Sequence, residues 1–382
     1  MKFAHLGDCH LGGWRQPELK ELNFKSFQYA VGKCIYEKVD FILISGDLFD
    51  SAYPPIETLK ETFQEFRKLK EANIPVFLIA GSHDYSVSGK TFLDVLEKAG
   101  FSTNASKYEE RDGKIFLSPI VYKNVAIYGY SGKKSGLEVD DIERIKLQDS
   151  PGLFKILMLH TAIRGALGGL PVKSVDERKL PFVNYLALSH LHIIYSKENR
   201  VYSGPIFPNN ISELEELRNG MFYIYDNGKV FRQEIKLKEV LVLDMKTKNA
   251  LSVTDDILLS LENKNVSDKI VLLKLSGILE QGRSSDINFQ KIEEYLRRKN
   301  AYVFLKSISR LHLPEPEVKI DFIDSVNLES QIIRNFEQKN PNKFNTLINE
   351  LSTALQVEKL EDEKSIVFEE RLMSEINRIL KI

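Results

Sequence analysis

The sequence has few cysteines, almost no net charge and no long apolar run. Its two cysteines, Cys9 and Cys34, are too few for a disulfide framework and fit a reducing compartment. No apolar run approaches the roughly 18 residues that a membrane-spanning helix needs. The N-terminal MKFAHLGD is too short and too polar for a secretory signal. We therefore expect a cytoplasmic protein that makes no membrane contact.

The balance of charge excludes a further class of protein. The chain has 53 lysines and arginines against 54 aspartates and glutamates, so its formal net charge is −1. A protein whose whole surface attracts nucleic acid would be far more basic. Any contact with nucleic acid must therefore come from a local patch, from metals or from a partner.

What the sequence does contain is enough apolar material for packed cores. Hydrophobic residues make up 43% of the 382 residues, and the length suggests two or three domains. Up to about residue 235, short apolar runs alternate with amphipathic segments, which is typical of a mixed α/β layer fold. The pattern then predicts a small βαβαβ unit and, last, a linker with two amphipathic helices. We expect domains at 1–235, 236–322 and 323–382.

Apolar periodicity locates the predicted elements. Predicted strands are 3–8, 41–47, 75–83, 124–131, 154–160 and 185–192. Predicted helices of the first domain are 24–35, 56–72 and 90–99. In the last domain, helical stripes at 344–355 and 368–380 flank a charged stretch. Two helices alone cannot bury both apolar faces, so we expect them to dock on another surface, either a partner or the protein itself.

Residues of metal-ligand type stand where the predicted strands of the first domain end. They are Asp8, His10, Asp47, His83, His160, His190 and His192. Ligands of open α/β sheets gather outside the carboxyl ends of the strands. Burying so many polar and charged side chains together without a bound ligand would cost free energy, which argues against a purely structural role. Mixed carboxylate and imidazole ligands suit Mn, Fe or Zn, and the set is large enough for two ions that clamp the oxygens of a phosphoryl displacement.

The order of the motifs carries a resemblance to a known family. Asp-x-His at 8–10 is followed by Gly-Asp-x-x-Asp at 46–50, Gly-x-His-Asp at 81–84, His160 and Ser-His-x-His at 189–192. In this order the motifs resemble those of the calcineurin-like metallophosphoesterases, and in detail the Mre-type nucleases, which are related to bacterial SbcD. The resemblance implies a four-layer α/β/β/α sandwich with a small α/β cap domain, for DNA binding and specificity, and a C-terminal helical tail.

The resemblance also implies roles for individual residues. The first metal would be held by Asp8, His10, Asp47 and His192. The second would be held by Asp47, His160 and His190, together with Ser82. His83 would face the substrate phosphate and protonate the leaving oxygen or steady its charge. Asp84 would orient His83. The cofactors implied are two Mn²⁺ ions, with Mg²⁺, Fe²⁺ or Zn²⁺ as substitutes.

The stretch 81-GSHDYSVSGKT-91 also raises a second interpretation. Its end looks like the Gly-Lys-Thr of a phosphate-binding P-loop, but that motif needs a glycine at position 84, which is Asp84. Lys90 and Thr91 are better explained as the start of a helix. Ser82 stands where the resembling family usually has asparagine, so we expect the second metal to be held weakly or through water. Asp50, often histidine in the family, and Ser189, often glycine, are smaller departures.

By resemblance, the function is that of a Mn-dependent DNA nuclease in double-strand-break repair, a single-strand endonuclease and 3′–5′ double-strand exonuclease. The implied partners are DNA, a Rad-type coiled-coil ATPase bound by the tail, and a second copy in a homodimer built on the outer parts of the helices at 56–72 and 90–99; a nucleoid association would follow. Two alternatives remain open: a phosphodiesterase or phosphatase for small substrates, and a scaffold in which Ser82 has impaired metal binding.

Other conspicuous residues have simpler explanations. His5 lies inside a predicted strand and is expected to be packed or hydrogen-bonded, His312 to lie on the surface, and Cys9 to be a small buried thiol. Several basic residues could contact phosphates or could belong to solvated faces, and both interpretations stay open. They are Lys133, Lys134, Arg164, Lys173, Arg178, Lys179, Arg297, Arg298 and Lys299.

Overall fold

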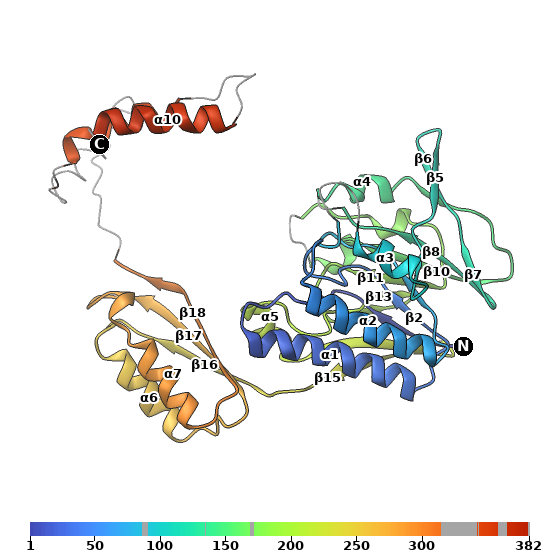
Figure 1. The fold of residues 1–382 in the computed structure, drawn as a ribbon, viewed down its shortest axis with the longest axis horizontal. Helices are drawn as coiled ribbons and strands as arrows, with labels where there is room; N and C mark the ends of the chain where they lie inside the picture. Colours follow the sequence, from blue (N-terminus) through green and yellow to red (C-terminus); the bar gives the residue numbers. More distant parts are fainter. Residues whose placement is uncertain are drawn as a thin grey trace. The chain divides into compact units, whose positions relative to one another are not determined.

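The chain forms two structural units in a computed structural model, Met1–Leu313 and Pro314–Ile382. The structure describes residues 1–85, 91–133, 135–168, 172–314, 342, 344–357 and 365–380. Lys90, Lys134 and the linker predicted from residue 323 lie outside these residues. Figure 1 shows the fold. No helix within the described ranges is both long and apolar enough to cross a membrane.

The first sheet has six strands in the order β15-β14-β1-β2-β3-β4. They are β1 (Lys2–Leu6), β2 (Phe41–Ile44), β3 (Val76–Leu78), β4 (Thr103–Asn104), β14 (Gly220–Asp226) and β15 (Lys229–Ile235). Strands β1 to β4 are parallel, whereas β14 pairs antiparallel with β1 at one edge and β15 pairs antiparallel with β14. The helices α1 (Pro17–Tyr36), α2 (Ile56–Glu71) and α3 (Phe92–Lys98) pack their apolar side chains on its outer face.

The second sheet also has six strands, in the order β12-β13-β11-β10-β8-β7. They are β7 (Ile120–Tyr122), β8 (Val125–Tyr130), β10 (Phe154–His160), β11 (Tyr185–Ser189), β12 (Tyr195–Lys197) and β13 (Arg200–Tyr202). Its outer face is covered by α4 (Glu138–Ile142) and by a three-stranded sheet of β5 (Tyr108–Arg111), β6 (Lys114–Leu117) and β9 (Ile145–Leu147). The predicted four-layer sandwich is confirmed, with a fourth layer that is part helix and part small sheet.

The core between the sheets is rich in aromatic rings and also buries a small group of hydrogen-bonded polar side chains. Phe3 of β1 stacks on Phe41 of β2, with ring centroids 4.9 Å apart, and meets Tyr185 of β11 edge-on. The fully buried imidazole of His5 bridges the Tyr185 hydroxyl (3.1 Å) and the Ser45 hydroxyl (2.8 Å). Burial lowers the pKa of His5 to about 3, so this imidazole is neutral. His5 is therefore a hydrogen-bonded core residue, as expected.

The predicted βαβαβ unit is confirmed as a parallel three-stranded sheet with two helices. It consists of β16 (Val240–Lys246), α6 (Val253–Glu262), β17 (Ile270–Ile278), α7 (Phe289–Arg298) and β18 (Val303–His312). Both helices bury their apolar side chains on one face of this sheet. This βαβαβ sheet belongs to the first structural unit, Met1–Leu313. The domain boundary at residue 235 stays a prediction.

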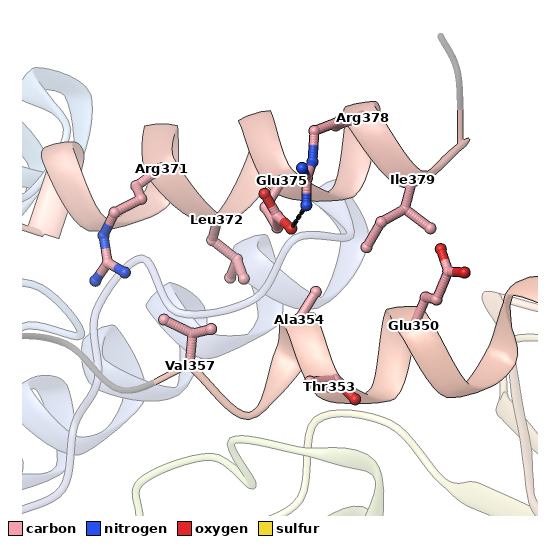
Figure 2. Close-up of a pocket in the computed structure, with 9 residues that line it drawn as sticks. All are labelled: Glu350, Thr353, Ala354, Val357, Arg371, Leu372, Glu375, Arg378 and Ile379. Atoms are coloured by element: carbon pink, nitrogen blue, oxygen red, sulfur yellow. Dashed lines mark hydrogen bonds and ion pairs between the residues drawn. The ribbon is translucent and has the colours of Figure 1, made fainter.

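The second unit contains the two helices predicted for the tail. They are α9 (Ile348–Leu355), preceded by the short turn η4 (Asn345–Leu347), and α10 (Ser365–Leu380). A pocket of about 580 Å³ lies between α9 and α10 (Figure 2). Leu372 and Ile379 of α10 face Ala354 of α9 across this pocket. Leu355, Val367 and Met373 remain 63%, 49% and 53% exposed, so the two helices leave part of their apolar surface uncovered.

Candidate metal centre

The candidate ligands come from the carboxyl ends of strands in both sheets. Asp8 and Asp47 follow β1 and β2 of the first sheet, His160 ends β10 of the second, and His190 directly follows β11. Asp8, His10 and Asp47 all adopt the left-handed backbone region, with φ of 48°, 42° and 50°. Non-glycine residues rarely adopt this region, and such strain clusters at functional sites. The sharp turns after the strands thus direct these side chains to one place.

Two imidazoles point at each other in this place. The Nε2 atoms of His10 and His192 lie 3.2 Å apart, and each ring is held from behind by a carboxylate. The Nδ1 atom of His10 lies 3.1 Å from Asp50 Oδ1, and that of His192 lies 2.9 Å from Glu213 Oε1. A carboxylate accepts a hydrogen bond, so Nδ1 of each ring carries a proton and Nε2 faces the centre, where it becomes a ligand atom once it is deprotonated.

A third imidazole, that of His160, is oriented in the same way by neutral groups. Its Nδ1 atom lies 3.2 Å from the Ser45 carbonyl oxygen, which can only accept, and 2.9 Å from the Ser189 hydroxyl. Its Nε2 atom is buried and makes no hydrogen bond within the described part of the chain, although Asp47 Oδ2 lies 3.1 Å away. A buried nitrogen without a hydrogen-bond partner calls for an explanation, and a bound cation supplies one.

The two buried carboxylates stand between these rings. Asp8 Oδ1 lies 3.8 Å from His192 Nε2, and Asp47 Oδ2 lies 3.8 Å from His10 Nε2. Among the residues that the structure describes, three groups of side chains each bring their ligand atoms within 4.8 Å of one another. They are Asp8 with His10 and His192, Asp8 with Asp47 and His160, and His10 with Asp50 and His83. The exposed ring of His190 stacks edge-on against His160 at 5.0 Å, and its amide donates to the Asp8 carboxylate.

Two glycines make room for this packing. A Cβ atom on Gly46 would collide with the His160 ring, and one on Gly81 would collide with the Asp47 carboxylate. Gly46 also has φ of 111°, which L side chains rarely adopt. The backbone at Gly46 and Gly81 therefore lies directly against His160 and Asp47. A side chain at either glycine would displace the candidate ligand beside it.

Burial and neighbouring charges together shift the pKa values of the side chains in this cluster. Burial alone would lower the pKa of His160 and His192, but Asp47 acts on the first and Asp8 with Glu213 on the second, raising both to about 9. Burial also opposes ionisation of Asp47, but the neighbouring His160 and His10 hold its pKa well below the ordinary value. Protons on histidines thus balance the carboxylates, and a cation would displace those protons.

The donor set fits a divalent cation. It contains buried imidazole Nε2 atoms with their Nδ1 atoms already engaged, and carboxylates whose charge is balanced only by protons. Imidazole with carboxylate suits Mn, Fe or Zn more than Mg alone. The division of the ligands between a first and a second ion stays a prediction.

The loop after β3 brings the remaining predicted site residues to the rim. Ser82 Oγ lies 3.5 Å from Asp47 Oδ2, and the His83 amide donates to Asp47 Oδ1 at 2.8 Å. The ring of His83 is about half exposed, and its Nδ1 lies 2.9 Å from the Asp50 carbonyl oxygen. This leaves Nε2 of His83 open at the edge of the cluster.

Asp84 has contacts that the sequence did not predict. Its buried carboxylate accepts from the amides of Phe49 and Gly81, at 3.1 and 2.9 Å. Burial, and then repulsion from Asp47, raise the pKa of Asp84 to about 7. Asp84 thus joins the loops that carry Asp47 and His83, while the group facing His83 Nδ1 is the Asp50 carbonyl. Orientation of His83 by Asp84 stays a prediction.

Sequence reasoning missed Ser45 and Glu213, which contact the candidate ligands His160 and His192. It also missed Asn209, which contacts Asp50 and Glu213 behind them. Ser45 contacts His160 through its backbone carbonyl, which no side-chain motif reveals. Asn210 caps the short helix α5 (Ile211–Leu217), and its side chain accepts from the Glu213 amide. The Asn-x-x-Glu spacing at 210–213 is a sequence signal for a helix start, but it does not say that Glu213 reaches His192.

Most of the basic residues that could contact phosphate are paired with acidic side chains of the same chain. Lys133, Arg164, Lys173, Arg178, Lys179 and Arg297 all form ion pairs with carboxylates of this chain. Exposed pairs of this kind contribute little to stability. Their abundance favours the interpretation of these residues as solvated faces, and leaves the cluster of ligands as the main candidate for phosphate recognition.

The chain is similar to curated proteins named DNA double-strand break repair protein Mre11. The protein from Methanosarcina mazei is 29% identical over 85% of this chain and 52% of its own length. That from Methanosarcina acetivorans is 28% identical over 87% of this chain and 55% of its own length. That from Methanocaldococcus jannaschii is 26% identical over 87% of this chain and 88% of its own length. The chain thus spans about half the length of the two Methanosarcina relatives.

A family match covers the part of the chain that carries the cluster. Residues 1–193, half of the chain, match the calcineurin-like phosphoesterase family. This range runs from β1 to just past His192 and so contains every candidate ligand predicted from the sequence. The two-sheet architecture and the buried carboxylate–imidazole cluster at the strand ends agree with the match. The chain belongs to the calcineurin-like phosphoesterase family.

Proposed function

We propose that this protein is a Mn²⁺-dependent DNA nuclease of double-strand-break repair that hydrolyses phosphodiester bonds at a two-metal centre. The observation that carries the proposal is the convergence of three imidazole Nε2 atoms on two buried carboxylates, with each Nδ1 atom engaged elsewhere. The similarity to proteins named for DNA double-strand break repair supports DNA as the substrate.

In this proposal the cluster holds the cations. Asp8, His10, Asp47 and His192 hold the first, and Asp47, His160, His190 and Ser82 hold the second. When bound, two cations activate a water molecule and neutralise charge on the phosphate. The side-chain carboxylates of Asp50 and Glu213 and the backbone carbonyl of Ser45 fix the orientation of the three imidazoles, so little reorganisation is needed when the metal enters.

His83 has the position of a residue that touches the substrate. Because the Asp50 carbonyl accepts from Nδ1, the exposed Nε2 faces the substrate side, and when the ring carries a second proton this atom can donate to a phosphate oxygen or protonate the leaving oxygen. The amide of His83 is tied to Asp47, which keeps the ring beside the cations. We therefore assign His83 to the substrate rather than to a metal.

A comparison of three substrates tests the function. Purified protein with Mn²⁺ is incubated with circular single-stranded DNA, with a duplex carrying 3′ ends, and with the small ester bis(p-nitrophenyl) phosphate. We expect cleavage of both DNA substrates, abolished by chelation and restored by Mn²⁺. Turnover of the small ester alone would favour a small-substrate phosphodiesterase. No turnover, with fewer than two ions bound, would favour the scaffold alternative.

Ser82 gives a separate prediction about the second metal. Its short hydroxyl lies 3.5 Å from Asp47, whereas an asparagine carbonyl would reach further into the cluster. Ser82→Asn is expected to tighten binding of the weaker Mn²⁺ ion about tenfold. Calorimetric titration of metal-free protein measures this, with Ser309→Asn at an exposed position as the matched control. Unchanged affinity and stoichiometry would contradict the role given to Ser82.

We propose further that the tail binds a Rad-type coiled-coil ATPase. The apolar side chains that α9 and α10 leave exposed are the surface offered for this contact. Removal of residues 330–382 is expected to abolish co-purification with the ATPase while leaving DNA cleavage in the first unit. Retention of the ATPase by the shortened chain would contradict the proposal.

A homodimer also stays a prediction. Ile56 on α2 and Val95 on α3, which are 80% and 47% exposed, would contribute to its interface.

A further inference from the structure

The rings of His10 and His192 are held by two carboxylates that are themselves joined. Asp50 contacts His10 and Glu213 contacts His192, and both are linked through Asn209. The Asn209 side-chain amide donates to Asp50 Oδ1 at 3.4 Å, and its backbone amide donates to Glu213 Oε2 at 2.8 Å. One short segment therefore fixes the orientation of both facing imidazoles.

Glu213 is held in this position by its own helix start. The Asn210 side chain donates to Glu213 Oε1 at 2.5 Å and accepts from the Glu213 amide at 3.0 Å. The second carboxylate oxygen of Glu213 is taken by Asn209, and Glu213 therefore presents a fixed acceptor to His192 rather than a flexible one.

The same segment is packed against the βαβαβ unit. Phe207 and Leu214 are buried in one cluster with Ile270, Leu272 and Leu305 of its sheet. The cluster also contains Trp14, the single tryptophan of the chain, whose indole donates to the Pro208 carbonyl at 2.8 Å. Lys274 of β17 pairs at 2.5 Å with Glu215, which lies on α5 two residues after Glu213.

We propose that Phe207–Glu215 couples the first metal to the docking of the βαβαβ unit, with Asn209 and Glu213 as positioning residues. This inference rests on the proposed metal centre. The segment cannot shift with the βαβαβ sheet without moving Glu213 away from His192 and Asn209 away from Asp50. Coupling between two equilibria is reciprocal. Metal binding therefore stabilises the docked sheet, and loosening of the sheet weakens metal binding.

Metal titration tests the positioning role. Glu213→Ala removes the acceptor behind His192 and is expected to weaken binding of one Mn²⁺ ion about 10- to 100-fold. Glu213→Gln keeps an acceptor oxygen and is expected to recover part of this loss. Glu216→Ala, exposed on the same helix, is the matched control and should bind Mn²⁺ as the wild type does. Equal affinities for Glu213→Ala and Glu216→Ala would overturn the inference.

Hydrogen exchange of the full chain tests the coupling, and its decisive comparison uses the wild-type protein alone. Amides of β17 are expected to exchange more slowly in the wild-type protein with Mn²⁺ than after chelation, and this difference should be lost in Glu213→Ala. Protection that does not depend on Mn²⁺ in the wild type would overturn the coupling. A wild type that binds Mn²⁺ and cleaves DNA but shows no such protection would refute this inference alone. A wild type that binds no Mn²⁺ would refute the metal centre itself.

Discussion

Replacement of Asp47 by asparagine is expected to lower Mn²⁺-dependent DNA cleavage at least about 1,000-fold, equivalent to about 4 kcal/mol of transition-state stabilisation. The Asp47 carboxylate lies 3.1 Å from His160 and 3.8 Å from His10, so it stands between the two proposed cation positions. Loss of its charge removes the group that both cations would share, and with it the clamp on the attacking and leaving oxygens.

The measurement compares initial cleavage rates over a wide range of Mn²⁺ concentration. Asp47→Asn nearly preserves the side-chain volume, which matters because Gly81 is pressed against this side chain. Asp255→Asn, on an exposed carboxylate paired with Lys291, controls for the general loss of one negative charge. A rate within about threefold of the wild type for Asp47→Asn would show that the cluster is not the site of hydrolysis.

The second large effect is expected at His83, where cleavage and metal binding should separate. His83→Ser is expected to lower kcat about 100- to 10,000-fold, the usual contribution of a general acid or base. Because the ring is about half exposed and lies at the rim, its removal should leave the Mn²⁺ stoichiometry and the fold unchanged. Metal titration and single-turnover cleavage of the same preparation measure the two properties.

The structure offers a specific alternative that this experiment decides. His83 lies within ligand distance of His10 and Asp50, so it could hold a cation itself. If His83→Ser loses an ion together with its activity, His83 is a ligand and the assignment to the substrate is wrong. His312→Ser, at an exposed position on β18, provides the control for removal of a histidine.

Most of the fold could be predicted because parallel strands and helices leave strong periodic patterns. The predicted strands at 41–47 and 154–160 and the helix at 56–72 appear as β2, β10 and α2 with shifts of a few residues. The antiparallel strands β14 and β15 were not singled out. Strand β14 pairs with β1, more than 200 residues away, and pairing at such a distance leaves no local signal. The hairpin of β14 and β15 turns at Asn227-Gly228, a local signal that sequence reasoning did not use.

The residues of the candidate site also fall into those that could be predicted from the sequence and those that could not. The side chains that project from strand ends, such as Asp8 and His160, follow from the order of strands and the ligand chemistry of each residue type. Glu213 and the carbonyl of Ser45 depend on how loops fold back, and no spacing rule connects residue 213 to residue 192. Outside the cluster, Thr91 was predicted from local sequence alone to start a helix. It caps α3 and forms a reciprocal capping box with Asp94, which confirms this prediction.

The arrangement of the sheets has a consequence for the newly made chain. The carboxylates come from one sheet and His160, His190 and His192 from the other, so neither half can gather a full set of donors by itself. The first sheet is completed only by β14 and β15, which are synthesised after every donor. A nascent chain therefore carries every candidate ligand before it carries the two strands that complete the first sheet, and we expect the cluster to assemble only late in synthesis.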